Sequence, residues 1–307
     1  MGGRKPLGTA DGPDTDLLMK PGTRRIAVLF HERDRETSLS SYIVDHLARY
    51  WREDGHEVVY LFGTKSHVPA DLILVHVDLS VVPRKYLAFA SRYPIVLNGQ
   101  VRDIRKSLVS ANLVRARDSW TGPVIVKTDL NYAGKPERAR TPKWLEKRPR
   151  VLRTVRRAKA WLTGRGNQPE LTDYLIFESA SEVPVALFRR KDVVVERFLP
   201  ERENNLFHLR ICQVLGNQRI CTRLASREPV IKAGMSVSSE PIEPHPDVET
   251  WRKRFGLDYG KLDYLVNDGR AVLIDVNKTI GASRQVANAP LQAMRHRLAQ
   301  GLYGYFT

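Results

Sequence analysis

Two carboxylates and a carboxamide near the C-terminus have the types and spacing of a metal site. Two apolar runs flank residues 267–270, whose central Asp-Gly predicts the turn of a β-hairpin. Asp263 lies near the start of the first strand, and Asp275 and Asn277 project from one face at the end of the second. Mg²⁺ takes up such hard oxygen ligands together with substrate phosphates. The alternative is that these residues only end a strand, because Asp and Asn are common in turns.

A lysine at the end of an apolar strand is a second candidate. The strand is PVIVK, residues 123–127, and the loop that follows it contains Asn131 and Gly134. A lysine here would neutralise phosphate charge, and N–H groups of the loop would donate to phosphate oxygens. The alternative for Lys127 is an ordinary solvated residue at a strand end. The pattern is therefore compatible with a nucleotide site but is not specific for one.

Two arginines are predicted to face each other across another hairpin. A Gly-Asn pair at 216–217 fits a two-residue turn of type II′, and this register places Arg210 opposite Arg223 and Cys212 opposite Cys221. Like charges directly opposite each other destabilise a hairpin, so we expect an anion between the arginines. The cysteines are expected to be buried thiols that behave as small hydrophobic residues.

Together, these segments resemble the ATP-grasp superfamily, in particular its RimK-type peptide-ligase branch. Asp275 lies 12 residues after Asp263 and Asn277 lies two residues after Asp275, and these separations match the family's metal-binding signature. The segment 193–201, VVVERFLPE, resembles the hinge between the two subdomains that clasp ATP. The resemblance covers about residues 103–284.

The resemblance implies a role for each matching position. Asp263, Asp275 and Asn277 would hold Mg²⁺, as two ions, on ATP. The residues implied in nucleotide binding are Lys106, Lys127, Asn131, Gly134, Glu196, Phe198 and Glu203. Among them, the lysines would contact phosphates, the hinge would contact adenine, and Glu203 would hold the ribose. The residues implied in catalysis are Arg210, Arg223 and Lys232. Ala133 stands where a loop glycine is expected in the family.

The activity implied is that of an ADP-forming ligase. It would join a small-molecule or peptide carboxylate to an amine or a thiol through an acyl phosphate, with ATP and Mg²⁺. A kinase of the same superfamily, which phosphorylates a hydroxyl directly, is the first alternative.

The elements that must position these residues predict an α/β and α+β protein with the ATP-grasp fold. Alternating strands and helices from about residue 24 to 100 predict a small parallel α/β lobe, and two α+β subdomains would follow and clasp ATP. The expected units are a flexible leader (1–23), the N-terminal lobe (24–100), and subdomains at 101–192 and 193–307. The later helices are expected at 103–114, 149–164, 247–255 and 290–302.

Composition sets the broader limits. With 307 residues, 42% hydrophobic and 27% charged, the chain has the balance of a soluble globular protein. No apolar run approaches the roughly 20 residues that a membrane span needs. The N-terminus has no signal peptide and there are only two cysteines. We therefore expect a cytoplasmic protein.

The net charge of +16 is concentrated in one stretch. Residues 138–165 contain eleven Lys or Arg and a single acid, Glu146. Such a segment could contact a polyanion, or it could be the solvated face of a helix. A non-enzymatic nucleic-acid binder is a further alternative, but only Trp144 and Trp161 could stack on bases there.

Overall fold

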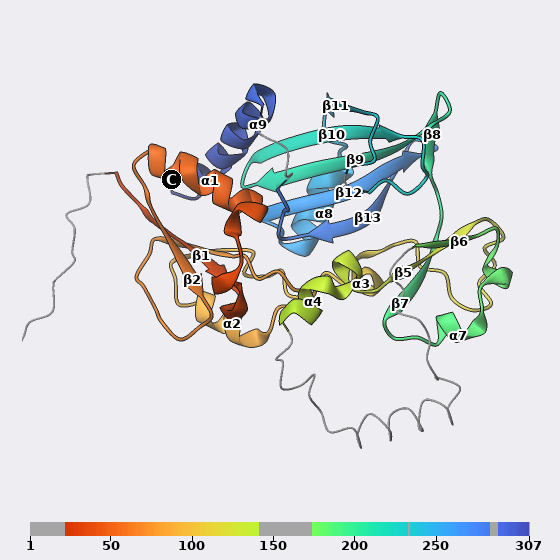
Figure 1. The fold of residues 1–307 in the computed structure, drawn as a ribbon, viewed down its shortest axis with the longest axis horizontal. Helices are drawn as coiled ribbons and strands as arrows, with labels where there is room; N and C mark the ends of the chain where they lie inside the picture. The colour runs from red at the N-terminus through yellow and green to blue at the C-terminus, as the bar shows by residue number, and fades with distance from the viewer. Residues whose placement is uncertain (1–21, 141–173, 233, 283–287, 307) are drawn as a thin grey trace, which may run out of the picture.

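Three separate sheets organise the chain in the computed structural model, which describes residues 22–140, 174–232, 234–282 and 288–306 (Figure 1). The first sheet is parallel and the other two are antiparallel. The mixed α/β and α+β class predicted from the sequence is therefore confirmed. The predicted helix at 149–164, most of the basic segment and most of the leader lie outside the described residues.

The N-terminal sheet has four parallel strands in the order β2-β1-β3-β4. Its elements are β1 (Arg25–Phe30), α1 (Ile43–Glu53), β2 (Glu57–Phe62), β3 (Leu72–Val75), α2 (Arg84–Ala90) and β4 (Ile95–Leu97). Strand β1 is buried on both faces, as expected for a central parallel strand. Ile26, Val28 and Phe30 pack in a core with α1, whereas Ala27 and Leu29 pack in a second core with α2.

The second sheet has three antiparallel strands in the order β6-β5-β7. Its strands are β5 (Val124–Thr128), β6 (Leu175–Phe177) and β7 (Val193–Arg197). Nearby lie the short helices α3 (Lys106–Val109), α4 (Lys135–Arg140) and α7 (Val185–Phe188). The expected boundary between the subdomains, after residue 192, falls before β7, yet β7 pairs with β5 along its whole length.

The third sheet has six strands and contains both predicted hairpins. Its strands are β8 (Glu201–Glu203), β9 (Leu206–Leu215), β10 (Gln218–Ser226), β11 (Ser238–Ile242), β12 (Tyr259–Asn267) and β13 (Arg270–Asn277). Helix α8 (Asp247–Phe255) packs on one face through Val248. At one end of the sheet, α9 (Ala289–Ala299) packs against α1 and joins the core of the N-terminal lobe (Figure 1).

The helix expected over 103–114 is much shorter in the structure. Helix α3 ends at Val109, and the chain then runs alongside β7. The N–H of Val114 donates to the carbonyl of Val195 at 2.8 Å, and Leu113 forms a bridge with Glu196. Pairing with a strand edge therefore replaces the helical hydrogen bonds that the sequence pattern predicted.

The cysteines correct another expectation, because they form a disulfide. Cys212 and Cys221 lie directly opposite each other, as predicted, with their Cα atoms 4.0 Å apart. Residues directly opposite each other in an antiparallel pair project to the same face, so the two sulfur atoms can meet. The pairing could be predicted from the turn, but the expected free thiols are not what the structure contains.

The register of the third sheet determines which side chains share a face. Asp263 lies opposite Asp275 on one side and opposite Ile211 on the other. In the next row, Tyr264 lies opposite Arg210. Side chains of neighbouring rows project to opposite faces of the sheet. Arg210 and Tyr264 therefore lie on one face, and Asp263 lies on the other. The Tyr264 face packs against α8.

Candidate functional site

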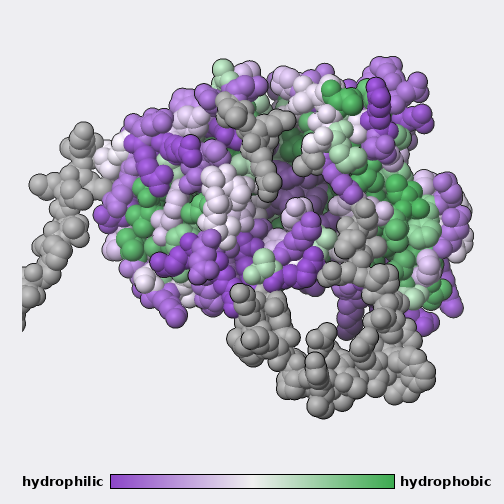
Figure 2. Space-filling model, viewed as in Figure 1, coloured by the Kyte–Doolittle hydropathy of each residue, from purple (hydrophilic) through white to green (hydrophobic). Residues whose placement is uncertain are grey.

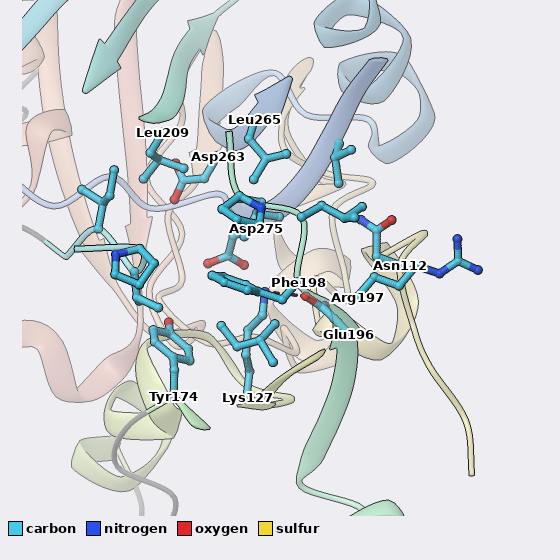
Figure 3. Close-up of a pocket in the computed structure, with 18 of the residues that line it drawn as sticks. Asn112, Lys127, Tyr174, Glu196, Arg197, Phe198, Leu209, Asp263, Leu265 and Asp275 are labelled. Atoms are coloured by element: carbon cyan, nitrogen blue, oxygen red, sulfur yellow. Dashed lines mark ion pairs between the residues drawn. The ribbon is translucent and has the colours of Figure 1, made fainter. Parts of the chain in front are cut away.

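A cavity lies between the three-stranded and six-stranded sheets, on the Asp263 face of the larger sheet. Figure 2 shows a hollow near the middle of this side of the molecule, with both hydrophilic and hydrophobic residues around it. The apolar walls of the cavity come from both sheets and from the segment after β7: Ile125, Phe198, Leu199, Leu209, Leu265, Val272 and Leu273. In Figure 3, Lys127 and Tyr174 rise from one side of the cavity, and Asp263 lies on the opposite side.

Lys127 and Glu196 form a buried ion pair in the cavity wall. They come from neighbouring strands β5 and β7, and only 5% of Lys127 and 3% of Glu196 is exposed. The second carboxylate oxygen of Glu196, Oε1, is buried without a hydrogen-bond partner among the described residues. An unmet acceptor of this kind is costly, so a ligand that donates a hydrogen bond would relieve it.

Lys106 enters the cavity from α3, which Asp129 holds against the end of β5. The carboxylate of Asp129 accepts from the N–H of Ser107 at 2.8 Å and from its hydroxyl at 3.0 Å. The buried Nζ of Lys106 donates to Oδ1 of Asn131 at 3.0 Å and lies 3.5 Å from Oδ1 of Asp275. The helix therefore aims a second cation at the candidate metal ligands.

The paired acids on β12 and β13 are surrounded by lysines. Nζ of Lys261 lies 2.9 and 2.7 Å from the two oxygens of Asp263. Burial raises the pKa of Asp263 and the charge of Asp275 raises it further, although Lys261 opposes the shift. Burial works to lower the pKa of Lys261, but Asp263 and then Asp275 raise it overall. Burial of the Tyr174 hydroxyl, with Asp275 and Asp263 nearby, raises its pKa to about 12.

These residues fit a magnesium ion by their chemistry. Within the described ranges, no three His, Cys, Asp or Glu side chains cluster, so the donor set is two carboxylates and one carboxamide. Asp263 and Asp275 lie opposite each other, so their like charges repel, and burial followed by the charge of Asp275 raises the pKa of Asp263. A divalent cation would remove the conflict, and Mg²⁺ prefers oxygen ligands shared with phosphates.

The loop after β5 holds the remaining nucleotide-side candidates. Asn131 bonds to Asn277, with Nδ2 lying 3.0 Å from Oδ1. Tyr132 and Ala133 adopt left-handed backbone angles, with φ of 48° and 53°, and Gly134 follows at 68°. Ala133 thus takes up a conformation that favours glycine, at the position where the family resemblance expects one.

Three predicted residues lie on the opposite face of the sheet from Asp263. Glu201 binds Arg210 at 2.8 Å and Arg223 at 3.2 Å, and Glu203 pairs with Arg223 as well. The expectation of an anion between the arginines is met by a carboxylate of the chain itself, so no ligand is needed there. Burial works to raise the pKa of Glu201, but the hydrogen bond from Arg210 leads a set of interactions that lower it overall. Because Asp263 lies on the other face, we do not assign a phosphate or ribose role to Arg210, Arg223 or Glu203.

Lys232 lies beside the cavity. The neighbouring Ile231 lines it, and Nζ of Lys232 is 5.9 Å from the centre of the Tyr174 ring. Of the other predicted residues, the cavity wall contains Lys106, Lys127, Glu196, Phe198, Asp263 and Asp275.

Two residues that the sequence argument missed belong to this site. Lys261 precedes Asp263 by two positions in one strand, so the two-residue period alone could have identified it. Tyr174, which directly precedes β6 of another sheet, lines the same cavity as the acids, and no local pattern in the sequence points to it.

No protein-family model matches the chain, and no curated protein matches it. Solved structures similar to it include D-alanine–D-alanine ligase from Bacillus anthracis complexed with ATP, with 12% identity, a TM-score of 0.48, and coverage of 92% of this chain and 97% of that one.

Two further similar structures have comparable values. A RimK domain ATP-grasp protein from Sphaerobacter thermophilus has 12% identity, a TM-score of 0.46 and coverage of 92% and 98%. The macrocyclase MdnC from Microcystis aeruginosa, bound with its precursor peptide MdnA, has 10% identity, a TM-score of 0.47 and coverage of 91% and 99%. The solved structures similar to this chain thus include an ATP-grasp protein, and ATP-grasp is the superfamily that the sequence resembles. At these scores, its function must be argued from its own site.

Proposed function

We propose that this chain is an ATP- and Mg²⁺-dependent ligase that joins a carboxylate to an amine or a thiol and releases ADP. The observation that supports this most directly is a cavity whose wall contains both two buried lysines and a pair of carboxylates. Lys106 and Lys127 supply the positive charge that a triphosphate needs. Asp263 and Asp275 supply the oxygens that its magnesium needs.

The apolar part of the cavity suits a purine base. Oε1 of Glu196 is an acceptor without a partner among the described residues, and it lies beside the apolar walls. The 6-amino group of adenine would donate to this oxygen, whereas guanine presents an oxygen at the same position. We therefore propose ATP rather than GTP as the nucleotide.

The phosphates would lie beside the two lysines and next to the acids. Lys106 and Lys127 would make charge-assisted hydrogen bonds to phosphate oxygens. Asp263, Asp275 and Asn277 would hold Mg²⁺, as two ions. When bound, Mg²⁺ neutralises phosphate oxygens and stabilises the charge that develops during transfer.

The reaction needs no covalent bond to the protein. In the first step, a carboxylate oxygen attacks the terminal phosphorus, the bond to the leaving ADP breaks, and an acyl phosphate forms. In the second step, an amine or thiol attacks the acyl carbon, loses its proton, and inorganic phosphate leaves. The contribution of the chain is to hold the reacting groups in line and to stabilise charge.

An ADP-release screen tests the proposal. Mixtures of small carboxylates or peptides with amines or thiols are incubated with ATP and Mg²⁺, and the product masses are determined. We expect ADP and phosphate to form with a product lighter by one water than its two substrates. A stable phosphoester in place of an amide or thioester would identify a kinase and overturn the proposal. None of the described helices is long and apolar enough to cross a membrane.

A further inference from the structure

Asn131 is a buried amide that forms hydrogen bonds both to a candidate phosphate-binding lysine and to a candidate metal ligand. Its Oδ1 accepts from Nζ of Lys106 at 3.0 Å. Its Nδ2 donates to Oδ1 of Asn277 at 3.0 Å and to the carbonyl of Val276 at 2.8 Å. Only 8% of Asn131 is exposed. Both ends of the amide are thus occupied by the protein.

The chemistry of these partners fixes the orientation of the Asn131 amide. Lysine can only donate, so it must meet the amide oxygen, and a carbonyl can only accept, so it must meet the amide nitrogen. With Nδ2 fixed in this way, the group of Asn277 that faces it must be the oxygen. The oxygen of Asn277 still has a second lone pair for another partner.

The backbone of Asn131 is anchored separately to the N-terminal lobe. Its N–H donates to Oγ of Ser80 at 2.9 Å. Ser80 follows β3, is 2% exposed, and donates its own N–H to Glu137 at 2.7 Å. The position of Asn131 is therefore set by the lobe, and its side chain transmits that position to two other elements.

We infer that Asn131 is a positioning residue that aligns the phosphate-side Lys106 with the metal-side Asn277. This inference rests on the proposed function for the identity of the ligands. Both hydrogens of the Asn131 amide nitrogen are engaged and its oxygen faces Lys106, so we place Asn131 behind the ligand-contacting residues rather than in contact with nucleotide or metal. By holding Lys106 on one side and setting the direction of the Asn277 oxygen on the other, it couples metal binding to phosphate binding.

The decisive variant is Asn131→Asp, which keeps the shape and removes the donor. An aspartate oxygen would then face Oδ1 of Asn277 and the carbonyl of Val276. Asn277 would be repelled from the position in which its Nδ2 lies 3.4 Å from Oδ2 of Asp275. Removing a hydrogen-bond partner of a metal ligand costs roughly 10–100-fold in metal affinity or activity. We expect Mn²⁺ binding, measured by electron paramagnetic resonance in the presence of ADP, to weaken about tenfold or more.

A second readout separates positioning from direct binding. The affinity for ADP in EDTA, measured by calorimetry, should change less than about threefold in Asn131→Asp, because no contact to the nucleotide is removed. Asn217→Asp makes the same chemical change at an exposed turn and should alter neither quantity. Ser80→Ala, which removes only the anchor, should weaken Mn²⁺ binding in the same direction but less.

Two results would overturn the inference. One is unchanged Mn²⁺ binding in Asn131→Asp with an unchanged melting temperature. The other is a loss of metal-free ADP binding as large as the loss of Mn²⁺ binding, which would make Asn131 a direct ligand. Neither measurement requires turnover, so failure of the ligase assay leaves this test intact. Conversely, normal binding with no ligation would count against the proposed reaction alone.

Discussion

Each of the two long hairpins of the six-stranded sheet has a pair of like charges on opposite strands, and the two pairs are compensated differently. In β12–β13, Asp263 lies opposite Asp275, and in β9–β10, Arg210 lies opposite Arg223. The arginines are compensated by Glu201, a fixed carboxylate of the chain that is itself 7% exposed. The aspartates are paired with lysines, Asp263 with Lys261 and Asp275 with Lys106, and both aspartates line a cavity.

We infer from this difference that a like-charged pair is better evidence for a ligand on a face that opens to a cavity than on a covered face. On the face that packs against α8, a neighbouring strand can supply the opposite charge, as β8 does with Glu201. Alternation along a strand predicts which residues share a face, but it does not say which face is covered. That information comes from how α8 and the three-stranded sheet dock on the two sides.

Removing one charge from the aspartate pair should produce the largest effect on activity. We expect Asp275→Asn to reduce ATP turnover by about 1000-fold or more while the protein stays folded, because metal and phosphate lose a charged partner. Steady-state ADP release and circular dichroism would measure both properties. Asp268→Asn, in the exposed turn of the same hairpin, is the matched control. Full turnover in Asp275→Asn at saturating Mg²⁺ would remove the metal site from this hairpin.

The lysine at the end of β5 should matter far more than a lysine in the neighbouring loop. We expect Lys127→Ala to weaken ATP binding about 100-fold, because a buried charge-assisted contact is lost. Lys135 lies over the ring of the exposed Tyr132, so Lys135→Ala should change binding less than about twofold. Calorimetric titration of both variants with ATP gives the comparison.

A control is needed because Lys127 also compensates Glu196. Lys127→Ala leaves that carboxylate buried without its charged partner, so the melting temperature should fall too. The double variant Lys127→Met with Glu196→Gln removes both charges and should recover most of the lost stability without recovering ATP binding. If binding returned with stability, the lysine would be only a structural partner.

For the arginine pair, the structure predicts an effect on stability rather than on turnover. Arg210→Met leaves the mostly buried Glu201 with one arginine fewer, and we expect a loss of about 1–3 kcal/mol in unfolding free energy with turnover nearly unchanged. The sequence pattern alone predicts the reverse, unchanged stability and lost phosphoryl transfer. Urea unfolding and ADP release decide between them, with the exposed Arg270→Met as control.

The loss of unfolding free energy in Arg210→Met should depend on pH. The pKa of Glu201 is lower in the folded chain than its ordinary value, so its pairing stabilises the fold fully above about pH 4.5. As pH falls below that value towards the lowered pKa, this contribution disappears. The stability difference between the wild-type chain and Arg210→Met should therefore be large at pH 7 and shrink at acidic pH. A difference that does not change with pH would mean that Arg210 acts through packing.

Much of the fold and part of the site could be predicted because their signals are local. Asp-Gly and Gly-Asn turns with alternating apolar runs determined both hairpins, and hence the pairs Asp263–Asp275 and Arg210–Arg223. The contribution of Tyr174 could not be predicted, because it depends on contact between residues of different sheets. The same is true of the short α3, where pairing of the following chain with β7 overrides the helical pattern.

The smallest expected effect concerns the turns of the two hairpins. Asp268 and Gly269 both have positive φ, as in a type I′ turn, whereas Gly216 alone does so in the other hairpin, as in type II′. A Cβ at Gly269 would meet nothing within 4 Å. Gly269→Ala should therefore cost only the backbone strain of a left-handed residue, about 1 kcal/mol of unfolding free energy.

Gly216→Ala, the corresponding substitution in the β9–β10 turn, adds a steric overlap to the backbone strain. A Cβ at Gly216 would lie 2.0 Å from the carbonyl oxygen of Gly301, where the hairpin tip packs against the C-terminal segment after α9. Backbone must shift to relieve that overlap, so Gly216→Ala should cost clearly more unfolding free energy than Gly269→Ala, by about 1–3 kcal/mol. Urea unfolding of the two variants measures the difference. Equal losses would mean that the tip of β9–β10 is free of the C-terminal segment, and that the two hairpins differ in their charges alone.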